Sequence, residues 1–157
     1  MALPNQPNES EALVRDMYLS DLDAVVGIER ASFPTPWSRA SFQSELMENN
    51  FAAYLVLDFH GRVVAYGGMW LILDEAHVTN VAVHPDFRGY HLGERMMVGL
   101  MGKAQALNAV RMTLEVRRSN LVAQSLYQKL GFSQLGVRRG YYSDPREDAF
   151  IMWKDPL

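Results

Sequence analysis

The segment from Asn80 to Gly93 holds the residues whose types and order most directly suggest a ligand. A predicted strand ends at Pro85, a loop with Arg88 and Gly89 follows, and a helical pattern then begins. Successive backbone N–H groups in such a turn form a concave anion site, to which a helix N-terminus and the Arg88 guanidinium add positive potential. These features would suit a pyrophosphate. The loop could equally be a plain strand-to-helix connection whose glycines serve only backbone geometry.

Later elements carry a carboxylate and several tyrosines at notable positions. Glu115 lies between two aliphatic residues of a predicted strand, so it shares a face with Thr113. Tyr127 lies on the side of a predicted helix that should face the sheet. Taken separately, these two are explained as a solvated carboxylate and a core tyrosine. The pair Tyr141 and Tyr142 offers stiff apolar walls with hydroxyl donors, or it packs at a sheet edge.

The sequence lacks the parts of several common chemistries. It contains no cysteine, which excludes disulfides, thiolate metal ligands and a thiol nucleophile. Its histidines show no His-Glu-x-x-His pattern, and each is interpreted first as an ordinary surface or core histidine. A Gly-x-Ser-x-Gly nucleophile motif, a P-loop and a Gly-x-Gly-x-x-Gly motif are all missing. We therefore expect no metal and no hydrolase, NTPase or dinucleotide chemistry.

Length and composition predict one folded domain over residues 1–157. The chain is 48% apolar and 21% charged, which is typical of a globular protein. Its longest apolar run, Val63–Leu73, is much shorter than the ~20 residues of a membrane-spanning helix. Residues 1–11 have no signal-peptide pattern and are interpreted as a flexible lead-in. We expect a cytoplasmic protein with no membrane partner; its oligomeric state is left open.

Charge is unevenly distributed along the chain. Residues 1–84 carry 4 Lys and Arg against 11 Asp and Glu (−7), and residues 85–157 carry 11 against 7 (+4), which gives the net charge of −3. Two differently solvated faces would explain this simply. Alternatively, the C-terminal half receives a polyanion and the N-terminal half a cation. No basic surface of the kind that binds nucleic acid is evident.

Hydrophobic periodicity and turn residues predict a mixed α/β fold in the order β-α-α-β-β-β-α-β-α-β-β. Ser20, Ser38 and either Ser119 or Asn120 are the expected helix caps, and Gly131 the expected left-handed stop. The strands are expected at Ala12–Met17, Phe51–Asp58, Arg62–Leu73, Ala76–Val83, Arg111–Val116, Phe132–Arg139 and Ala149–Lys154.

Taken together, these segments resemble the GCN5-related N-acetyltransferase (GNAT) superfamily, over residues 13–153. Within it, the sequence is similar to the RimI-type branch, which acetylates the N-terminal alanine of the eighteenth small-subunit ribosomal protein. The most specific match is Leu114–Asn120. The other similar stretches are Phe33–Ser38, Leu126–Tyr127 with Leu130–Phe132, and Arg138–Tyr142 with Arg146–Ala149.

The resemblance implies a fold and a cosubstrate site. The sheet would have about seven strands, splayed in the middle and flanked by about four helices. Acetyl-CoA would bind between Ala76–Val83 and Arg111–Val116, with its pantetheine arm along the backbone of Val81, Ala82 and Val83. Asn120 would contact it as well. The loop that would hold the pyrophosphate consists of Arg88, Gly89, Tyr90, His91, Leu92 and Gly93. His91 stands where the family usually has glycine, and histidine tolerates the left-handed conformation.

The resemblance also implies chemistry. Glu115 would accept the proton of the attacking amine through water, and Tyr127 would protonate the departing thiolate. Phe33, Trp37, Tyr141 and Tyr142 are expected to surround the peptide N-terminus, and the acidic N-terminal half, with Glu45, Glu48, Asp74 and Glu75, could attract a basic peptide. Alternatives are a relative that acts on a lysine side chain or a small amine, and a catalytically silent CoA-binding module.

Overall fold

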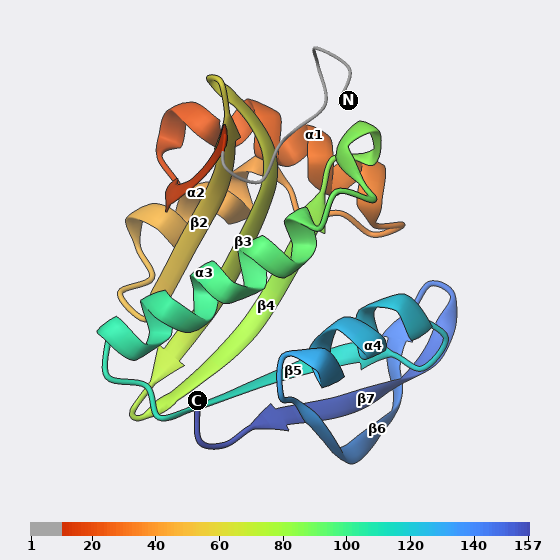
Figure 1. The fold of residues 1–157 in the computed structure, drawn as a ribbon. Helices are drawn as coiled ribbons and strands as arrows, with labels where there is room; N and C mark the ends of the chain where they lie inside the picture. Colours follow the sequence, from red (N-terminus) through yellow and green to blue (C-terminus); the bar gives the residue numbers. More distant parts are fainter. Residues whose placement is uncertain (1–10) are drawn as a thin grey trace.

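One mixed sheet forms the centre of the molecule. A computed structural model describes residues 11–157, so the predicted lead-in lies outside the described residues except for Glu11. The sheet of this part of the chain has seven strands in the order β1-β2-β3-β4-β5-β7-β6 (Figure 1). Only β4 and β5 run parallel. The strands are β1 (Ala12–Asp16), β2 (Ala52–Phe59), β3 (Arg62–Ile72), β4 (Glu75–Val83), β5 (Arg111–Arg117), β6 (Ser133–Ser143) and β7 (Arg146–Lys154).

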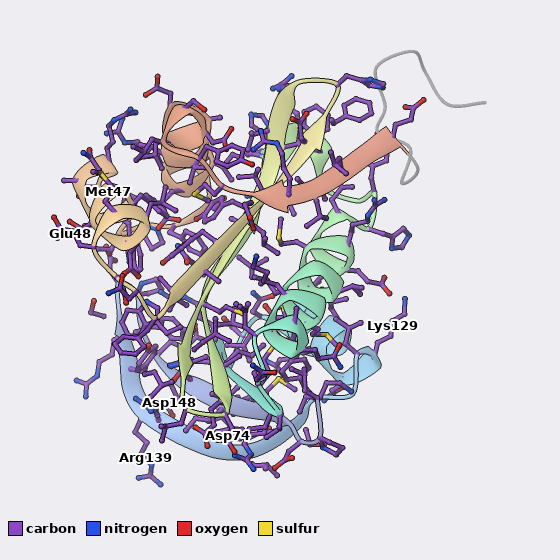
Figure 2. All side chains as sticks on the ribbon, turned by 90° about the vertical axis from the view of Figure 1, so that its left-hand side faces the viewer. Met47, Glu48, Asp74, Lys129, Arg139 and Asp148 are labelled. Atoms are coloured by element: carbon purple, nitrogen blue, oxygen red, sulfur yellow. The ribbon has the colours of Figure 1, made fainter. Side chains whose placement is uncertain are left out.

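Helices cover both faces of this sheet. One face carries α1 (Leu22–Ser32) and α2 (Arg39–Met47), and the opposite face carries α3 (Leu92–Ala106) and α4 (Leu121–Lys129) (Figures 1 and 2). Two short 3₁₀ helices, η2 (Leu19–Asp21) and η3 (Pro85–Phe87), precede α1 and follow β4. The layers agree with the predicted mixed α/β architecture.

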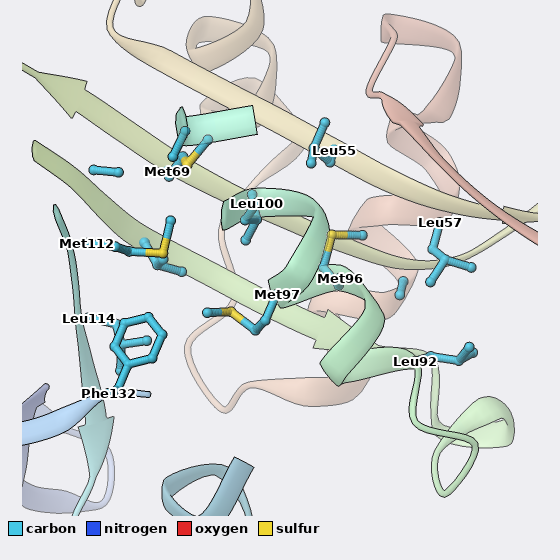
Figure 3. Close-up of a cluster of buried hydrophobic side chains, with 14 of the residues drawn as sticks. Leu55, Leu57, Met69, Leu92, Met96, Met97, Leu100, Met112, Leu114 and Phe132 are labelled. Carbon is cyan, nitrogen blue, oxygen red and sulfur yellow. The ribbon is translucent and has the colours of Figure 1, made fainter. Parts of the chain in front are cut away.

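Each helical layer buries its own apolar cluster against the sheet. On the α1–α2 face, Ile28 and Phe42 are buried beside Tyr54 and Tyr66. On the α3 face, a larger cluster includes fully buried α3 side chains, among them Met96, Met97 and Leu100 (Figure 3). Because both faces of the central strands are packed, the positions of β3 and β4 are fixed on two sides.

The predicted order of elements is confirmed, together with most of the predicted helix ends. The Ser38 hydroxyl accepts the Ser41 N–H at 3.1 Å, and Asn120 Oδ1 accepts the Ala123 N–H at 3.1 Å. Both side chains thereby satisfy a backbone donor that the first helical turn leaves free. Gly131 ends α4 with a φ of +100°, as its left-handed role requires.

The predicted cap Ser20 is wrong. Residues Leu19–Asp21 form the 3₁₀ turn that leads directly into α1, so Ser20 lies inside a helical segment and does not precede one. Asp21 occupies the cap position of α1, and its carboxylate accepts the Tyr18 N–H at 2.8 Å and pairs with Arg15. The Asp21 carboxylate thus holds the backbone at Tyr18, ahead of the 3₁₀ turn, and makes no capping hydrogen bond to α1 itself.

The last two strands are longer than the sequence indicated. Pairing continues through Tyr142 with Glu147 and Ser143 with Arg146, beyond a register irregularity between Arg138 and Tyr142. Gly140, at a φ of +61°, lies within this irregularity. The predicted strand ended at Arg139, but β6 continues to Ser143 and the hairpin absorbs Gly140 as a distortion of its ladder.

The parallel pair at the centre of the sheet is splayed. β4 and β5 pair only over Glu75–His77 and Arg111–Thr113, and they then diverge (Figure 1). β4 also contains a bulge at Thr79, because β3 pairs Gly68 with Asn80 and Met69 with Val78. None of the helices in residues 11–157 has the length and apolar character needed to cross a bilayer.

Candidate active site

The splay leaves one edge of β4 without a strand partner. The His84 N–H donates to the Val64 carbonyl at 2.8 Å, so His84 faces β3. Backbone groups alternate between the two edges of a strand, so Ala82, which pairs with Tyr66, also faces β3. Val81 and Val83 then direct their backbone groups into the gap. Ala82, one of the three residues predicted to contact the pantetheine arm, therefore has no backbone N–H or C=O directed into the gap.

The loop that follows β4 has the geometry of an anion cradle. Gly89 has a φ of +87°, and His91 adopts the left-handed conformation at a φ of 61°. His91 is also the residue before α3, and its side chain makes no capping hydrogen bond. The first N–H groups of α3 therefore have no side-chain cap. They also form the positive end of the helix dipole, which favours an anion at this position. The expectation that histidine tolerates this position is met in the backbone.

The remaining loop residues have different surroundings. Arg88 donates through Nε to the Val83 carbonyl and through Nη2 to the Ser32 hydroxyl, both at 3.1 Å. Its charge therefore lies between the end of β4 and α1. Leu92 is buried in the α3-face cluster and Tyr90 packs against that cluster. These two contribute backbone groups to the loop, with their side chains used for packing.

A cavity of about 340 Å³ opens beside the splay. It is lined by segments that are far apart in the sequence: the α1–α2 connection, the bulged part of β4, the end of β5, the start of α4 and the β6–β7 turn. Eight of the predicted site residues line it: Phe33, Trp37, Val81, Glu115, Asn120, Tyr127, Tyr141 and Tyr142. The predicted pyrophosphate loop, residues 88–93, lies outside this cavity.

Glu115 is one of the charged residues that line the cavity, and His77 contacts its carboxylate. His77 Nε2 lies 2.6 Å from Glu115 Oε2, and Arg138 Nη2 lies 3.8 Å from Oε1. Burial by itself would raise the pKa of Glu115, but the hydrogen bond and charge of His77 and the charge of Arg138 outweigh burial. The pKa of Glu115 therefore lies below its ordinary value. The carboxylate is ionised at neutral pH and available as a proton acceptor.

His77 was missed by the sequence interpretation, which treated it as an ordinary histidine. The contact depends on the short parallel pairing of β4 and β5, in which His77 is opposite Thr113. Glu115 follows two residues later on the same face of β5. Only the register of two strands 38 residues apart brings the two side chains together.

Tyr127 lines the same cavity from α4. Its ring packs 6.0 Å from that of Phe132, centroid to centroid. Burial raises the pKa of Tyr127 to about 12, so the phenol keeps its proton at all working pH values. Tyr127 is therefore a packed core residue, which was the simpler of the two interpretations of the sequence. It is also a potential proton donor to the cavity.

The predicted acceptor wall is brought together from both ends of the chain. Tyr141 and Tyr142 contact each other edge to face at 5.0 Å, opposite the α1–α2 connection. That connection is fixed by Glu29, which is only 2% exposed. Its carboxylate accepts the Trp37 N–H at 3.1 Å and a hydrogen bond from the Tyr66 hydroxyl. Burial raises the pKa of Glu29, although the Trp37 N–H opposes this.

The splayed pair β4 and β5 and the cavity beside it can now be compared with proteins of known class. Residues 22–132 match the model of the Acetyltransferase (GNAT) family. The chain belongs to this family, and the GNAT fold and acyltransferase class that the sequence indicated are confirmed.

Named members of the family are similar to this chain over most of its length. A Bacillus subtilis (strain 168) protein provisionally named a ribosomal protein bS18-alanine N-acetyltransferase is 44% identical over 145 residues, 92% of this chain and 96% of that protein. The Escherichia coli (strain K12) ribosomal protein bS18-alanine N-acetyltransferase is 36% identical over 143 residues, 88% and 94% of the two chains. The crystal structure of the Escherichia coli enzyme superposes with a TM-score of 0.84 at 33% identity, covering 92% and 94%.

Removing His77 should change how activity depends on pH. His77→Leu deletes the hydrogen bond and charge that oppose burial, so the pKa of Glu115 should rise. A base must be deprotonated, so the acidic limb of kcat/KM against pH should move to higher pH. His77→Gln, which can still donate a hydrogen bond, should recover part of the shift. Superimposable pH profiles for wild type and His77→Leu would contradict this role.

Proposed function

We propose that the chain transfers the acetyl group of acetyl-CoA to the N-terminal amine of a protein, namely the N-terminal alanine of ribosomal protein bS18. The observation that carries this proposal is the buried, ionised Glu115 in a cavity that opens beside the free edge of β4. The named relatives support the choice of acceptor. A ribosomal protein as substrate would place the reaction in the cytoplasm.

Family membership supports acetyl-CoA as the donor, and the residues present fit it. Val81 directs its backbone N–H and C=O into the gap and Val83 its N–H, as an added strand would need, whereas the Val83 carbonyl already accepts from Arg88. The loop around Gly89 and His91, with the free N–H groups of α3, would hold the diphosphate. An N–H of this β4 edge would also polarise the thioester carbonyl. Asn120, whose side-chain Oδ1 caps α4, also lines the cavity.

At neutral pH, an α-amine is easier to acetylate in this site than a lysine side chain. The attacking amine must be neutral, and a terminal amine has a pKa of ~8 against ~10.4 for lysine. At pH ~7, deprotonation costs about 1.4 kcal/mol for the former and about 4.6 kcal/mol for the latter. The amine then attacks the thioester directly, its proton passes to Glu115 through water, and Tyr127 protonates the thiolate. No covalent enzyme intermediate is required, in agreement with a chain that has no cysteine.

A peptide comparison tests the acceptor. The chain is incubated with acetyl-CoA and either an alanine-initiated peptide or its N-blocked, lysine-containing twin, and the products are located by mass spectrometry. We expect one acetyl group on the α-amine of the first peptide and none on the second. Acetylation of only the twin, or of polyamines, would favour the side-chain alternative. Binding of CoA without any product would favour the silent module.

The left-handed glycine of the loop should matter for the donor. At a φ of +87°, Gly89→Ala meets no atom within 4 Å, so its cost is backbone strain of ~1–2 kcal/mol. Because that strain must be overcome to form the cradle, KM for acetyl-CoA should rise roughly 5- to 30-fold, with kcat nearly unchanged. Gly102→Ala, in the middle of α3 and also free of contacts, is the matched control. Equal KM values for the two variants would remove the loop from donor binding.

A further inference from the structure

A second hollow adjoins the acceptor wall on the α1–α2 face. It is lined by two tryptophans, one carboxylate and small residues of α2: Trp37, Ala40, Ser41, Ser44, Glu45 and Trp70. Trp37 lines this hollow and the main cavity alike. Trp37 thus forms a wall common to the two hollows.

Glu45 is held at the wall of this hollow by neutral groups only. Its Oε1 accepts the Tyr54 hydroxyl at 2.8 Å and the Trp70 indole N–H at 2.6 Å, and its Oε2 accepts the Asn49 amide at 2.6 Å. A carboxylate has about four acceptor positions, so Oε2 can take a further donor. Tyr54 also reaches Thr79, which lines the main cavity, so polar contacts connect the two sites.

The negative charge of Glu45 is not neutralised within the described part of the chain. Every ion pair of residues 11–157 involves other carboxylates; Asp74 and Glu75, for example, lie 3.0 and 3.7 Å from Arg111. Asp74 and Glu75, which the sequence had offered as attractors of a basic peptide, are thus occupied. A half-buried carboxylate in a hollow lined by two tryptophans suits a guanidinium, which combines charge pairing with contacts to aromatic rings.

We propose that this hollow binds an arginine side chain of the acceptor peptide, several residues after its acetylated N-terminus. The inference rests on the proposed function, because it needs a peptide anchored in the main cavity. It assigns the acidic N-terminal half a defined role, in which Glu45 makes the contact. Glu48, which lies outward at the end of α2 and outside both cavities, does not take part (Figure 2).

The test compares matched peptides in matched variants. Alanine-initiated peptides carry one arginine or one citrulline, which has nearly the same shape without charge, at each position from the third to the sixth. For wild type we expect one position at which arginine raises kcat/KM roughly tenfold over citrulline, and this ratio should fall at high salt. Glu45→Gln should bring the ratio close to one, whereas the control Glu48→Gln should keep it.

A wild-type measurement covers the case in which Glu45→Gln does not fold. The arginine peptide should shift the NMR signal of the Trp70 indole N–H, and its citrulline twin should leave that signal in place. Trp153, which lines neither cavity, is the internal reference. Arginine and citrulline peptides that react equally well at every position, or a preference that survives in Glu45→Gln, would overturn the inference alone. A failure to acetylate any peptide would overturn the proposed function with it.

Discussion

Glu115→Gln should lower kcat by about 10²–10⁴-fold while acetyl-CoA binding is retained. The substitution keeps the shape of the side chain and an oxygen that can accept from His77, but it removes the ability to take a proton. Glu115 lines the cavity, so its replacement removes the group to which water would deliver the amine proton. The measurement is kcat with saturating acetyl-CoA and peptide, together with the Kd of acetyl-CoA by calorimetry.

A suitable control for Glu115→Gln is Glu75→Gln. Glu75 is a carboxylate on the neighbouring strand β4, half-exposed and 3.7 Å from Arg111, and it lies outside the cavity. Its loss should leave kcat within about twofold, since isolated surface ion pairs contribute little. Wild-type turnover in Glu115→Gln would discard the assignment of the base. An equal loss in both variants would point to a general effect of charge.

Tyr127→Phe should have the second-largest effect, a fall in kcat of roughly 10²-fold with little change in KM. The pKa of about 12 means that the phenol carries its proton whenever the enzyme works, so it can act as a donor but not as a base. The ring contact with Phe132 is retained in the variant. The effect should therefore come from the loss of the hydroxyl, with the free energy of unfolding changed by less than about 0.5 kcal/mol.

Steady-state kinetics and thermal unfolding of Tyr127→Phe together test this role. Tyr18→Phe removes a hydroxyl from an exposed tyrosine outside the cavity and should leave both measurements at wild-type values. If Tyr127→Phe retains the wild-type kcat, Tyr127 is a packing residue only. If kcat falls together with stability, the loss reflects damage to the core.

Local patterns predicted the elements well because they depend on nearby residues. The caps at Ser38 and Asn120 and the stop at Gly131 each follow from a side chain or a backbone conformation next to the helix end. The same holds for the order of strands and helices. Errors arose where a neighbour changed the outcome, as at Ser20, where a 3₁₀ turn extends the helical segment by three residues.

The sequence predicted the site residues that belong to a recognisable motif, but not the contacts between side chains of different strands. Glu115 and Tyr127 were found through a family pattern, whereas the contact between Glu115 and His77 requires the register of β4 against β5. Glu29 did carry a local signal, because it falls at helical spacing with the apolar residues of α1. A carboxylate on that face had to be buried with partners, but which backbone N–H it would hold depends on how the connection to α2 folds.

A crystal structure of the chain with CoA and an alanine-initiated peptide would test the central claim most directly. We expect CoA in the gap between β4 and β5, with its sulfur beside Tyr127 and the peptide amine in contact with Glu115 directly or through one water. Density for CoA elsewhere on the molecule, or an amine held away from Glu115, would contradict it.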